Sequence, residues 1–254
     1  MNQSSSGWQQ NNKNANSMKV RIRLSVRVIV LVLGTVFLVI FFAARSVNTQ
    51  FRTSIVDITS KNNEALLNNV ATAITNLSDD GVSKLLALRS VVESMTDGDY
   101  YSNEDLYKKL IKNFTESDKN QISSWLSFDN QFVSDDEDEG RQIITAENQA
   151  FGTEVRSTSV SSYNDNLESP YYICKEAEAP IVDEPDYYNM NGSSTERVMK
   201  MTIAVPIMRN GSVVGVLGSN LRLDGLQVYI DSLNSTAGQN IMVVSAGGRM
   251  VAYP

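Results

Sequence analysis

Residues 197–221, RVMKMTIAVPIMRNGSVVGVLGSNL, hold two runs rich in Val, Ile, Met and Thr on either side of Asn210-Gly211. Residues of these types favour β-strands. Asn-Gly tolerates the positive φ angles that a type I′ turn requires. The sequence therefore predicts a hairpin with strands at 197–208 and 212–221, and this hairpin indicates an antiparallel sheet.

Shorter elements are predicted on both sides of this hairpin. A helix is expected to begin at Asn103, and residues 131–170 are expected to be irregular, with the acidic run 135–139 as a solvated loop. The remaining predictions are a strand at 122–128 ending in a turn at 129–130, a strand at 180–183, a helix at 224–233 and a hairpin of 241–244 with 250–253. Helices beside an antiparallel sheet predict an α+β fold.

A long apolar run lies near the N-terminus. Residues 28–44 are 17 residues interrupted only by Gly34 and Thr35, and Leu24 to Val26 extend the run. At about 1.5 Å per residue the run covers roughly 25 Å, so residues 24–45 are predicted to be a transmembrane helix. A cleaved signal peptide is the less favoured alternative, because the run ends without a clean small-x-small cleavage site.

Charge predicts the orientation of this span. The basic cluster at 19–23 precedes the apolar run and is denser than the charges that follow it. Since positive charge favours the cytoplasmic side, residues 1–23 are expected to be a disordered, basic cytoplasmic tail. The chain from about residue 46 is then expected outside the inner (plasma) membrane.

A helical stripe follows the span. Apolar residues recur at intervals of three and four between 46 and 97, for instance at Val47, Phe51, Ile55, Ile58, Val70, Leu77, Leu85 and Val92. This pattern predicts a long helix that leaves the membrane and packs on a second element or a second subunit, as a stalk or dimer helix. A two-helix hairpin that breaks at Gly81 is an equally favoured alternative.

Composition excludes several classes of enzyme. The chain has no histidine and one cysteine, Cys174, which we expect to be buried and inert. Residues 46–254 hold 16 basic and 29 acidic residues, an excess of acid that disfavours nucleic-acid binding. The sequence therefore predicts a binding protein rather than an enzyme, with no catalytic residues, cofactor or metal site.

Several segments together carry a family resemblance. They are the strand and turn 125–131, the aromatic pair within Pro170-Tyr171-Tyr172, the Asp-Glu-Pro-Asp-Tyr-Tyr segment 183–188, the hairpin 201–221, and residues 238–254. In this order and spacing, residues 24–254 resemble the double Cache sensor region of bacterial methyl-accepting chemotaxis proteins.

The resemblance implies both architecture and function. Residues 98–233 would form a PAS-like, membrane-distal lobe that binds a small molecule, and residues 234–254 would begin a membrane-proximal lobe that is cut short. The family signals in chemotaxis, usually as a helical dimer, to a cytoplasmic histidine kinase and adaptor through a C-terminal region that is missing here. The same sensor on a histidine kinase or a cyclic-dinucleotide enzyme, and a tethered structural or binding protein, remain alternatives.

The resemblance also suggests ligand-binding residues. These are Trp125, Tyr171, Tyr172, Asp186, Tyr187, Tyr188 and Asn220. Tyrosines present an apolar face with a polar tip, which suits a small-molecule pocket, although sheet packing is expected for two of the four. Family members that bind amino acids have an Arg and an Asp where this chain has Ser169 and Asn220. A neutral or differently charged ligand therefore fits at least as well.

Overall fold

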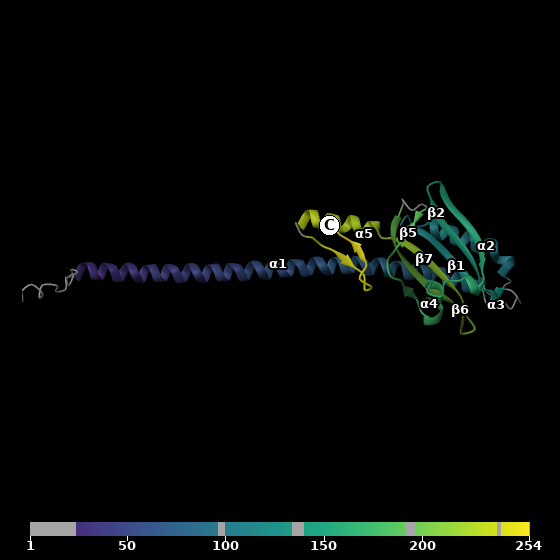
Figure 1. Cartoon of the computed structure of the whole chain (residues 1–254), viewed down its shortest axis with the longest axis horizontal. Coiled ribbons are helices and arrows are strands. Elements are labelled where there is room, and N and C mark those ends of the chain that lie inside the picture. The colour runs from purple at the N-terminus through teal and green to yellow at the C-terminus, as the bar shows by residue number, and fades with distance from the viewer. Residues whose placement is uncertain (1–23, 96–99, 134–139, 191–196, 238–239, 254) are drawn as a thin grey trace, which may run out of the picture. The chain divides into compact units, whose positions relative to one another are not determined.

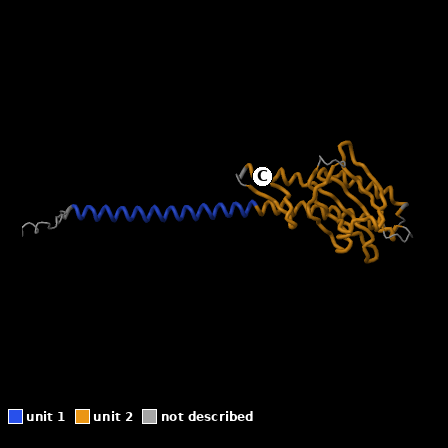
Figure 2. Tube along the Cα trace, in the orientation of Figure 1, with its two compact units in different colours: residues 1–66 blue, residues 67–254 orange. Residues whose placement is uncertain are grey.

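The computed structural model describes residues 24–95, 100–133, 140–190, 197–237 and 240–253 (Figure 1). The predicted tail at 1–23, residues 96–97 of the predicted long helix, and the acidic run 135–139 lie outside these ranges. The chain divides into two compact units, residues 1–66 and residues 67–254 (Figure 2).

The described part of the first unit is helical. Helix α1 spans Leu24–Met95, and its residues 24–66 belong to this unit. Among the described residues, α1 is the one helix long and apolar enough to cross a membrane by length and composition, with a mean hydropathy of 2.8 in its most apolar window. None of that window is buried. The predicted apolar segment is therefore helical and presents its side chains outward.

The second unit begins within the same helix. The alternative break at Gly81 is wrong, because α1 continues unbroken to Met95. A Cβ at position 81 would overlap the side chain of Ile203 and touch that of Leu221. Glycine at this position lets the helix approach the sheet closely. Gly81 therefore reflects close packing and does not mark a turn between two helices.

A sheet of seven described strands forms the centre of this unit, in the order β3-β2-β1-β7-β6-β4, with β5 also paired to β6. All of these pairs are antiparallel. The strands are β1 (Gln121–Asp129), β2 (Arg141–Gln149), β3 (Gly152–Val160), β4 (Ile181–Val182), β5 (Asp186–Asn189), β6 (Arg197–Arg209) and β7 (Ser212–Arg222). The α+β class is confirmed.

The predicted hairpin is present with the expected turn. Strands β6 and β7 pair across Asn210 and Gly211, whose φ angles are 52° and 83°. Both are positive, as a type I′ turn requires. The second predicted hairpin forms a separate two-stranded sheet of β8 (Val243–Val244) and β9 (Met250–Ala252), after helix α5 (Asp224–Ala237).

The prediction of an irregular segment at 131–170 is wrong. This segment contains β2, β3 and a 3₁₀ turn, η1 (Ser162–Asn164). Strand β3 lies at the sheet edge and is mostly exposed and polar, so it lacks the apolar alternation from which a strand is recognised. The predicted turn at 129–130 instead leads into a short helix, α3 (Asn130–Val133).

Helix α2 (Tyr100–Glu116) begins three residues before the predicted start. Asn103 therefore does not cap the helix but lies within its first turn, where its side-chain amide donates a hydrogen bond to the carbonyl oxygen of Met95 at 3.4 Å. This contact ties the start of α2 to the end of α1.

The sheet has two different faces. Side chains on one face pack with α1 and α2 into the main apolar core, which includes Leu126, Ile144, Ile203, Val205 and Leu217. The other face is covered in part by helix α4 (Pro170–Ala177), where a smaller cluster contains Tyr171, Cys174, Ala204 and Val216. Figure 1 shows α4 and α2 on opposite sides of the sheet.

Candidate functional site

A cavity of about 270 Å³ lies on the α4 face of the sheet, and we call it the α4 cavity. It is lined by residues from β1, β2, β6, β7 and the start of α4. These are Trp125, Arg141, Ile143, Thr145, Ser169, Pro170, Tyr171, Lys200, Thr202 and Asn220. The cavity thus combines an aromatic and aliphatic wall with several polar groups, which is typical of small-molecule sites.

Strand alternation places these side chains on one face. Ser123, Asn220 and Thr202 are register partners across β1, β7 and β6, so they form one cross-strand row, which we call the polar row. In the neighbouring row Trp125 lies opposite Gly218. A Cβ at position 218 would overlap the indole ring, so this glycine lets Trp125 lie flat across β7.

A chain of hydrogen bonds runs along the polar row. The Lys200 ammonium donates to the Thr202 hydroxyl at 2.9 Å, and this hydroxyl donates to the Asn220 side-chain oxygen at 2.7 Å. The Asn220 amide nitrogen in turn donates to the Ser123 hydroxyl at 2.8 Å. Asn220 therefore orients Thr202 and has both ends of its amide group occupied.

Lys200 lies in an unusual electrostatic environment. Burial lowers the pKa of Lys200 below its ordinary value, and the carboxylates of Asp186 and Asp183 oppose this shift only in part. Among the described residues, no carboxylate lies within ion-pair distance of the Lys200 ammonium. The cavity wall therefore contains a partly desolvated cation with a neutral hydroxyl as its hydrogen-bond partner.

Arg141, by contrast, is neutralised by an ion pair. Its guanidinium forms a bidentate ion pair with the Asp165 carboxylate, in which the Nη2–Oδ1 distance is 2.8 Å. The guanidinium also lies 4.3 Å from the centre of the Tyr171 ring. Burial alone would raise the pKa of Asp165, but hydrogen bonds from Arg141 and Tyr172 hold it below its ordinary value. This ion pair fixes the aromatic wall of the cavity.

The hydroxyl of Tyr171 is also bound. It donates to Asp129, whose carboxylate accepts from the Lys175 ammonium at 2.8 Å and 2.9 Å. Burial, followed by the nearby Asp129 charge, raises the pKa of Tyr171, so the phenol stays neutral. Cys174, on the same helix, is fully buried, and burial raises its pKa to about 12, as expected for an inert thiol.

The seven predicted site residues do not form one site. Trp125, Tyr171 and Asn220 line the α4 cavity. Tyr172 packs edge-on against Tyr171 and donates to Asp165 at 3.1 Å, which places it behind the cavity wall. Asp186 is paired with Arg249 and does not line the cavity.

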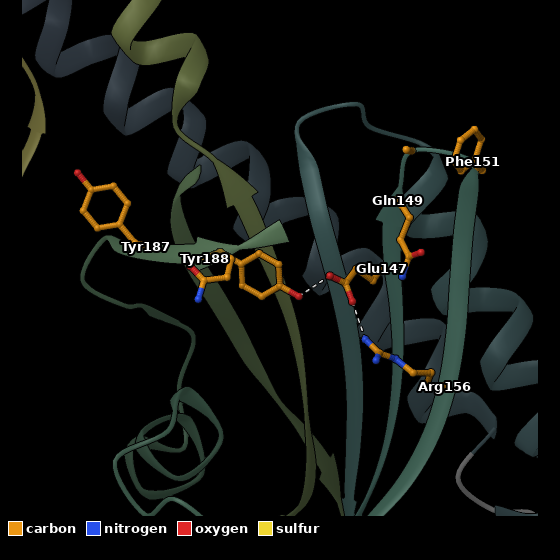
Figure 3. Close-up of a pocket in the computed structure, with 8 residues that line it drawn as sticks. Glu147, Gln149, Phe151, Arg156, Tyr187 and Tyr188 are labelled. Atoms are coloured by element: carbon orange, nitrogen blue, oxygen red, sulfur yellow. Dashed lines mark hydrogen bonds and ion pairs between the residues drawn. The ribbon is translucent and has the colours of Figure 1, made fainter. Parts of the chain in front are cut away.

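Tyr187 and Tyr188 line a second, wider pocket at the outer end of the β2–β3 hairpin, which we call the hairpin-end pocket. Its volume is about 830 Å³. Figure 3 shows Tyr188 pointing toward Glu147, which also pairs with Arg156, while Tyr187 points the other way. Adjacent strand residues point to opposite faces of a sheet, so the two side chains border this pocket while pointing in different directions.

The sequence analysis did not identify Lys200, Thr202 and Arg141 as site residues. Lys200 is the one charged residue between Arg197 and Arg209 in a mostly apolar strand, so that isolated charge was a usable signal. Arg141 begins a strand in the segment that was expected to be irregular, so no pattern placed it beside the aromatic pair.

Comparisons with known proteins point in one direction. No protein-family model matches the sequence. The methyl-accepting chemotaxis protein PscA of Pseudomonas syringae pv. tomato is 29% identical over 94 residues, which are 37% of this chain. These residues span 14% of the length of that protein.

Solved structures are similar over more of the chain. The periplasmic sensory domain of the Campylobacter jejuni chemoreceptor Tlp1 has a TM-score of 0.54 at 14% identity, over 73% of this chain and 69% of that one. The ligand-binding domain of C. jejuni Tlp3 in complex with L-valine has a TM-score of 0.58 at 14% identity, over 79% and 73%. This chain therefore has the fold of the periplasmic sensory domains of chemoreceptors.

Proposed function

We propose that this chain is the extracytoplasmic sensor region of a transmembrane chemoreceptor, in which the α4 cavity binds a small molecule. The observation that carries the proposal is the cavity itself, which combines an aromatic wall with a hydrogen-bonded polar row on the fold of a chemoreceptor sensory domain. Its volume of about 270 Å³ suits a compact metabolite rather than a drug-sized ligand.

The likeness to Tlp3 supports an organic ligand of this size, because that domain is described in complex with L-valine. In this chain Trp125 and Tyr171 would contact the apolar part of the ligand, and Thr202 and Lys200 would meet its polar part. Asn220 would act by holding Thr202 in place.

For the membrane topology, residues 24–45 would cross the membrane with the N-terminus in the cytoplasm. The fully exposed apolar window of α1 and the basic cluster before it support this orientation. Residues 98–233 would form a PAS-like distal lobe, and residues 234–254, which contain the β8–β9 ribbon, would begin a proximal lobe.

Two copies of α1 would pair outside the membrane and carry the signal toward a cytoplasmic kinase and adaptor. Val47, Phe51 and Ile58 are 65%, 64% and 59% exposed and lie on the predicted stripe, so a second helix would remove them from water. Because Cys174 is buried, a Phe51→Cys variant offers a single reactive thiol. Oxidation in membranes should produce a disulfide-linked dimer, and an exclusively monomeric product would contradict the pairing.

A thermal-shift screen tests ligand binding. The full chain in lipid nanodiscs would be screened against small polar and apolar metabolites, since a ligand that binds the folded state raises the unfolding midpoint. Thr202→Val should weaken the affinity for any hit by about tenfold, because it removes one cavity hydroxyl. Tyr163→Phe is the control, since Tyr163 is exposed and does not line the cavity. A screen without any hit, or a hit unaffected by Thr202→Val, would overturn the proposal.

A further inference from the structure

The charged groups that line the α4 cavity are all cationic. Arg141 and Lys200 are the two charged residues among the described residues that line it. Arg141 is neutralised by Asp165, whereas Lys200 has no ion pair among the described residues and supplies the cavity's uncompensated charge. A partly buried cation without a counter-ion is costly, and an anionic ligand would remove that cost.

Ser169 provides a second unsatisfied group. Its hydroxyl oxygen is buried, lines the cavity and has no hydrogen-bond partner within the described part of the chain. Ser169 precedes α4 as its N-cap, yet its side chain makes no capping hydrogen bond. Serine at this position usually caps the helix. The free hydroxyl is therefore available to donate a hydrogen bond to a ligand.

Several other polar groups at the cavity already have hydrogen-bond partners. Both ends of the Asn220 amide are hydrogen-bonded within the polar row. Asp129 and Asp165, which bind the lining residues Tyr171 and Arg141, each accept hydrogen bonds from a cation and from a tyrosine hydroxyl. We assign the polar end of the ligand to the Lys200 ammonium, which has no ion pair among the described residues, and to the buried Ser169 hydroxyl.

An ammonium group would find no anionic partner among the lining residues that the structure describes. Asp183 and Asp186 influence Lys200 electrostatically, but neither lines the cavity and Asp186 is paired with Arg249. A ligand amine would therefore be desolvated beside Lys200 without an acceptor of opposite charge, which is unfavourable. The aromatic and aliphatic wall formed by Trp125 and Ile143 instead suits an uncharged tail.

We propose that the α4 cavity selects a small monocarboxylate that has an apolar tail and no amino group, with Lys200 and Ser169 binding the carboxylate. This inference rests on the proposed function and specifies its ligand class. The carboxylate would also oppose the lowering of the Lys200 pKa by burial, because an adjacent anion stabilises the charged ammonium.

Matched sets of three compounds test this selectivity. Isovalerate, L-valine and isovaleramide share a branched carbon skeleton and differ in whether they present a carboxylate alone, a carboxylate with an amine, or an uncharged amide. Acetate, glycine and acetamide form a shorter set. Binding of each compound to the full chain in nanodiscs would be measured by isothermal titration calorimetry. In at least one set the carboxylate should bind about tenfold or more tightly than both partners.

Lys200→Met tests the proposed anchor. It should weaken carboxylate binding by about 10- to 100-fold, as expected for a charge-assisted hydrogen bond. Lys112→Met is the matched control, because Lys112 lies at the surface of α2 and pairs with Glu116. If Lys200 were only structural, its loss would lower the unfolding midpoint. We expect an unchanged or raised midpoint, because the variant removes a partly buried charge that has no ion pair in the described ranges.

The outcomes separate this inference from the proposed function. An amide or amino acid that binds as tightly as its carboxylate partner overturns the ligand class and leaves the sensor function standing. Carboxylate binding that Lys200→Met does not weaken overturns the anchor. If neither set binds but another metabolite does in the wider screen, only the inference fails. If no compound binds in either experiment, both fail.

Discussion

The two faces of the central sheet are built from the same strands but have opposite properties. On the α1 and α2 face, Ile203, Val205 and Ile207 of β6 are fully buried in the main core. On the α4 face, Lys200 and Thr202 of the same strand line a cavity and belong to a hydrogen-bonded row. A shift of one residue along the strand thus separates a packing position from a candidate binding position.

The comparison separates stability from recognition. A closely packed apolar face contributes most of the stabilisation by burying area. The other face retains unfilled volume and the unsatisfied hydroxyl of Ser169, which do not stabilise the free protein but favour a complementary ligand. Substitutions on the core face should therefore affect folding, whereas those on the α4 face should affect binding more.

The largest expected effect is on the core face. Ile203→Ala should lower the free energy of unfolding by about 3 kcal/mol, because it leaves a void between β6 and α1. Ile143→Ala on the cavity wall is the control, and it should cost about 1 kcal/mol because that side chain already borders open space. Urea unfolding of the full chain in detergent, followed by circular dichroism, measures both. Equal losses would contradict the contrast between the faces.

The ion pair on the α4 face should be the exception to this contrast. Arg141→Gln should cost about 2 kcal/mol, because the Asp165 side chain, only 4% exposed, would lose its counter-ion. The same urea titration measures this loss. Combining it with Asp165→Asn should recover part of the stability, since no buried charge then remains. Lys61→Gln, which breaks the exposed pair with Asp57, should have no measurable effect.

A smaller effect is expected where the Trp125 ring lies against the backbone of Gly218. Gly218→Ala should cost about 1.5 kcal/mol and move the Trp125 ring, because the added methyl group overlaps the indole. The change should appear in tryptophan fluorescence as well as in the unfolding midpoint. Gly225→Ala in α5 is the control, since a Cβ there meets open space. An unchanged fluorescence spectrum for Gly218→Ala would show that Trp125 does not depend on this close approach.

The smallest expected effect is the contribution of Asp165, on the α4 face, to the pH dependence of stability. The pKa of Asp165 is lowered in the folded state, so its stabilising contribution is present above the unfolded value of about 3.9 and is lost as the pH falls through the lower folded pKa. The unfolding midpoint of Asp165→Asn should therefore fall less than that of the wild type across this acidic range. Parallel acid titrations would contradict this assignment.

Much of the architecture was predictable because its signals are local. The turn chemistry of Asn210-Gly211 and the flanking runs predicted the β6–β7 hairpin, and the strand at 122–128 was predicted almost to its ends. The edge strand β3 was not predictable from its pattern, because both of its faces are polar. Gly81 gave a misleading signal, because its role depends on Ile203, which is far away in the sequence.

The candidate site was predictable only in part. The sequence named Trp125 and Tyr171 as candidate ligand-binding residues, and both line the α4 cavity. It could not predict that the four tyrosines lie in different environments. Which groups remain unsatisfied depends on partners from several strands. Lys200 and Arg141 are both cations in the same cavity, yet Asp165 neutralises Arg141, and Lys200 has no ion pair within the described part of the chain.

By itself the sequence determined the apolar segment near the N-terminus, the strand periodicity, the turn between β6 and β7, and the exclusion of histidine chemistry. These follow from composition and from neighbours within a few residues. The tertiary structure alone decided the register across β1, β7 and β6, the covering of one face by α4, and the environment of Lys200. The reason is physical: a cavity and its electrostatics are properties of groups that only folding brings together, at separations along the chain that no local pattern encodes.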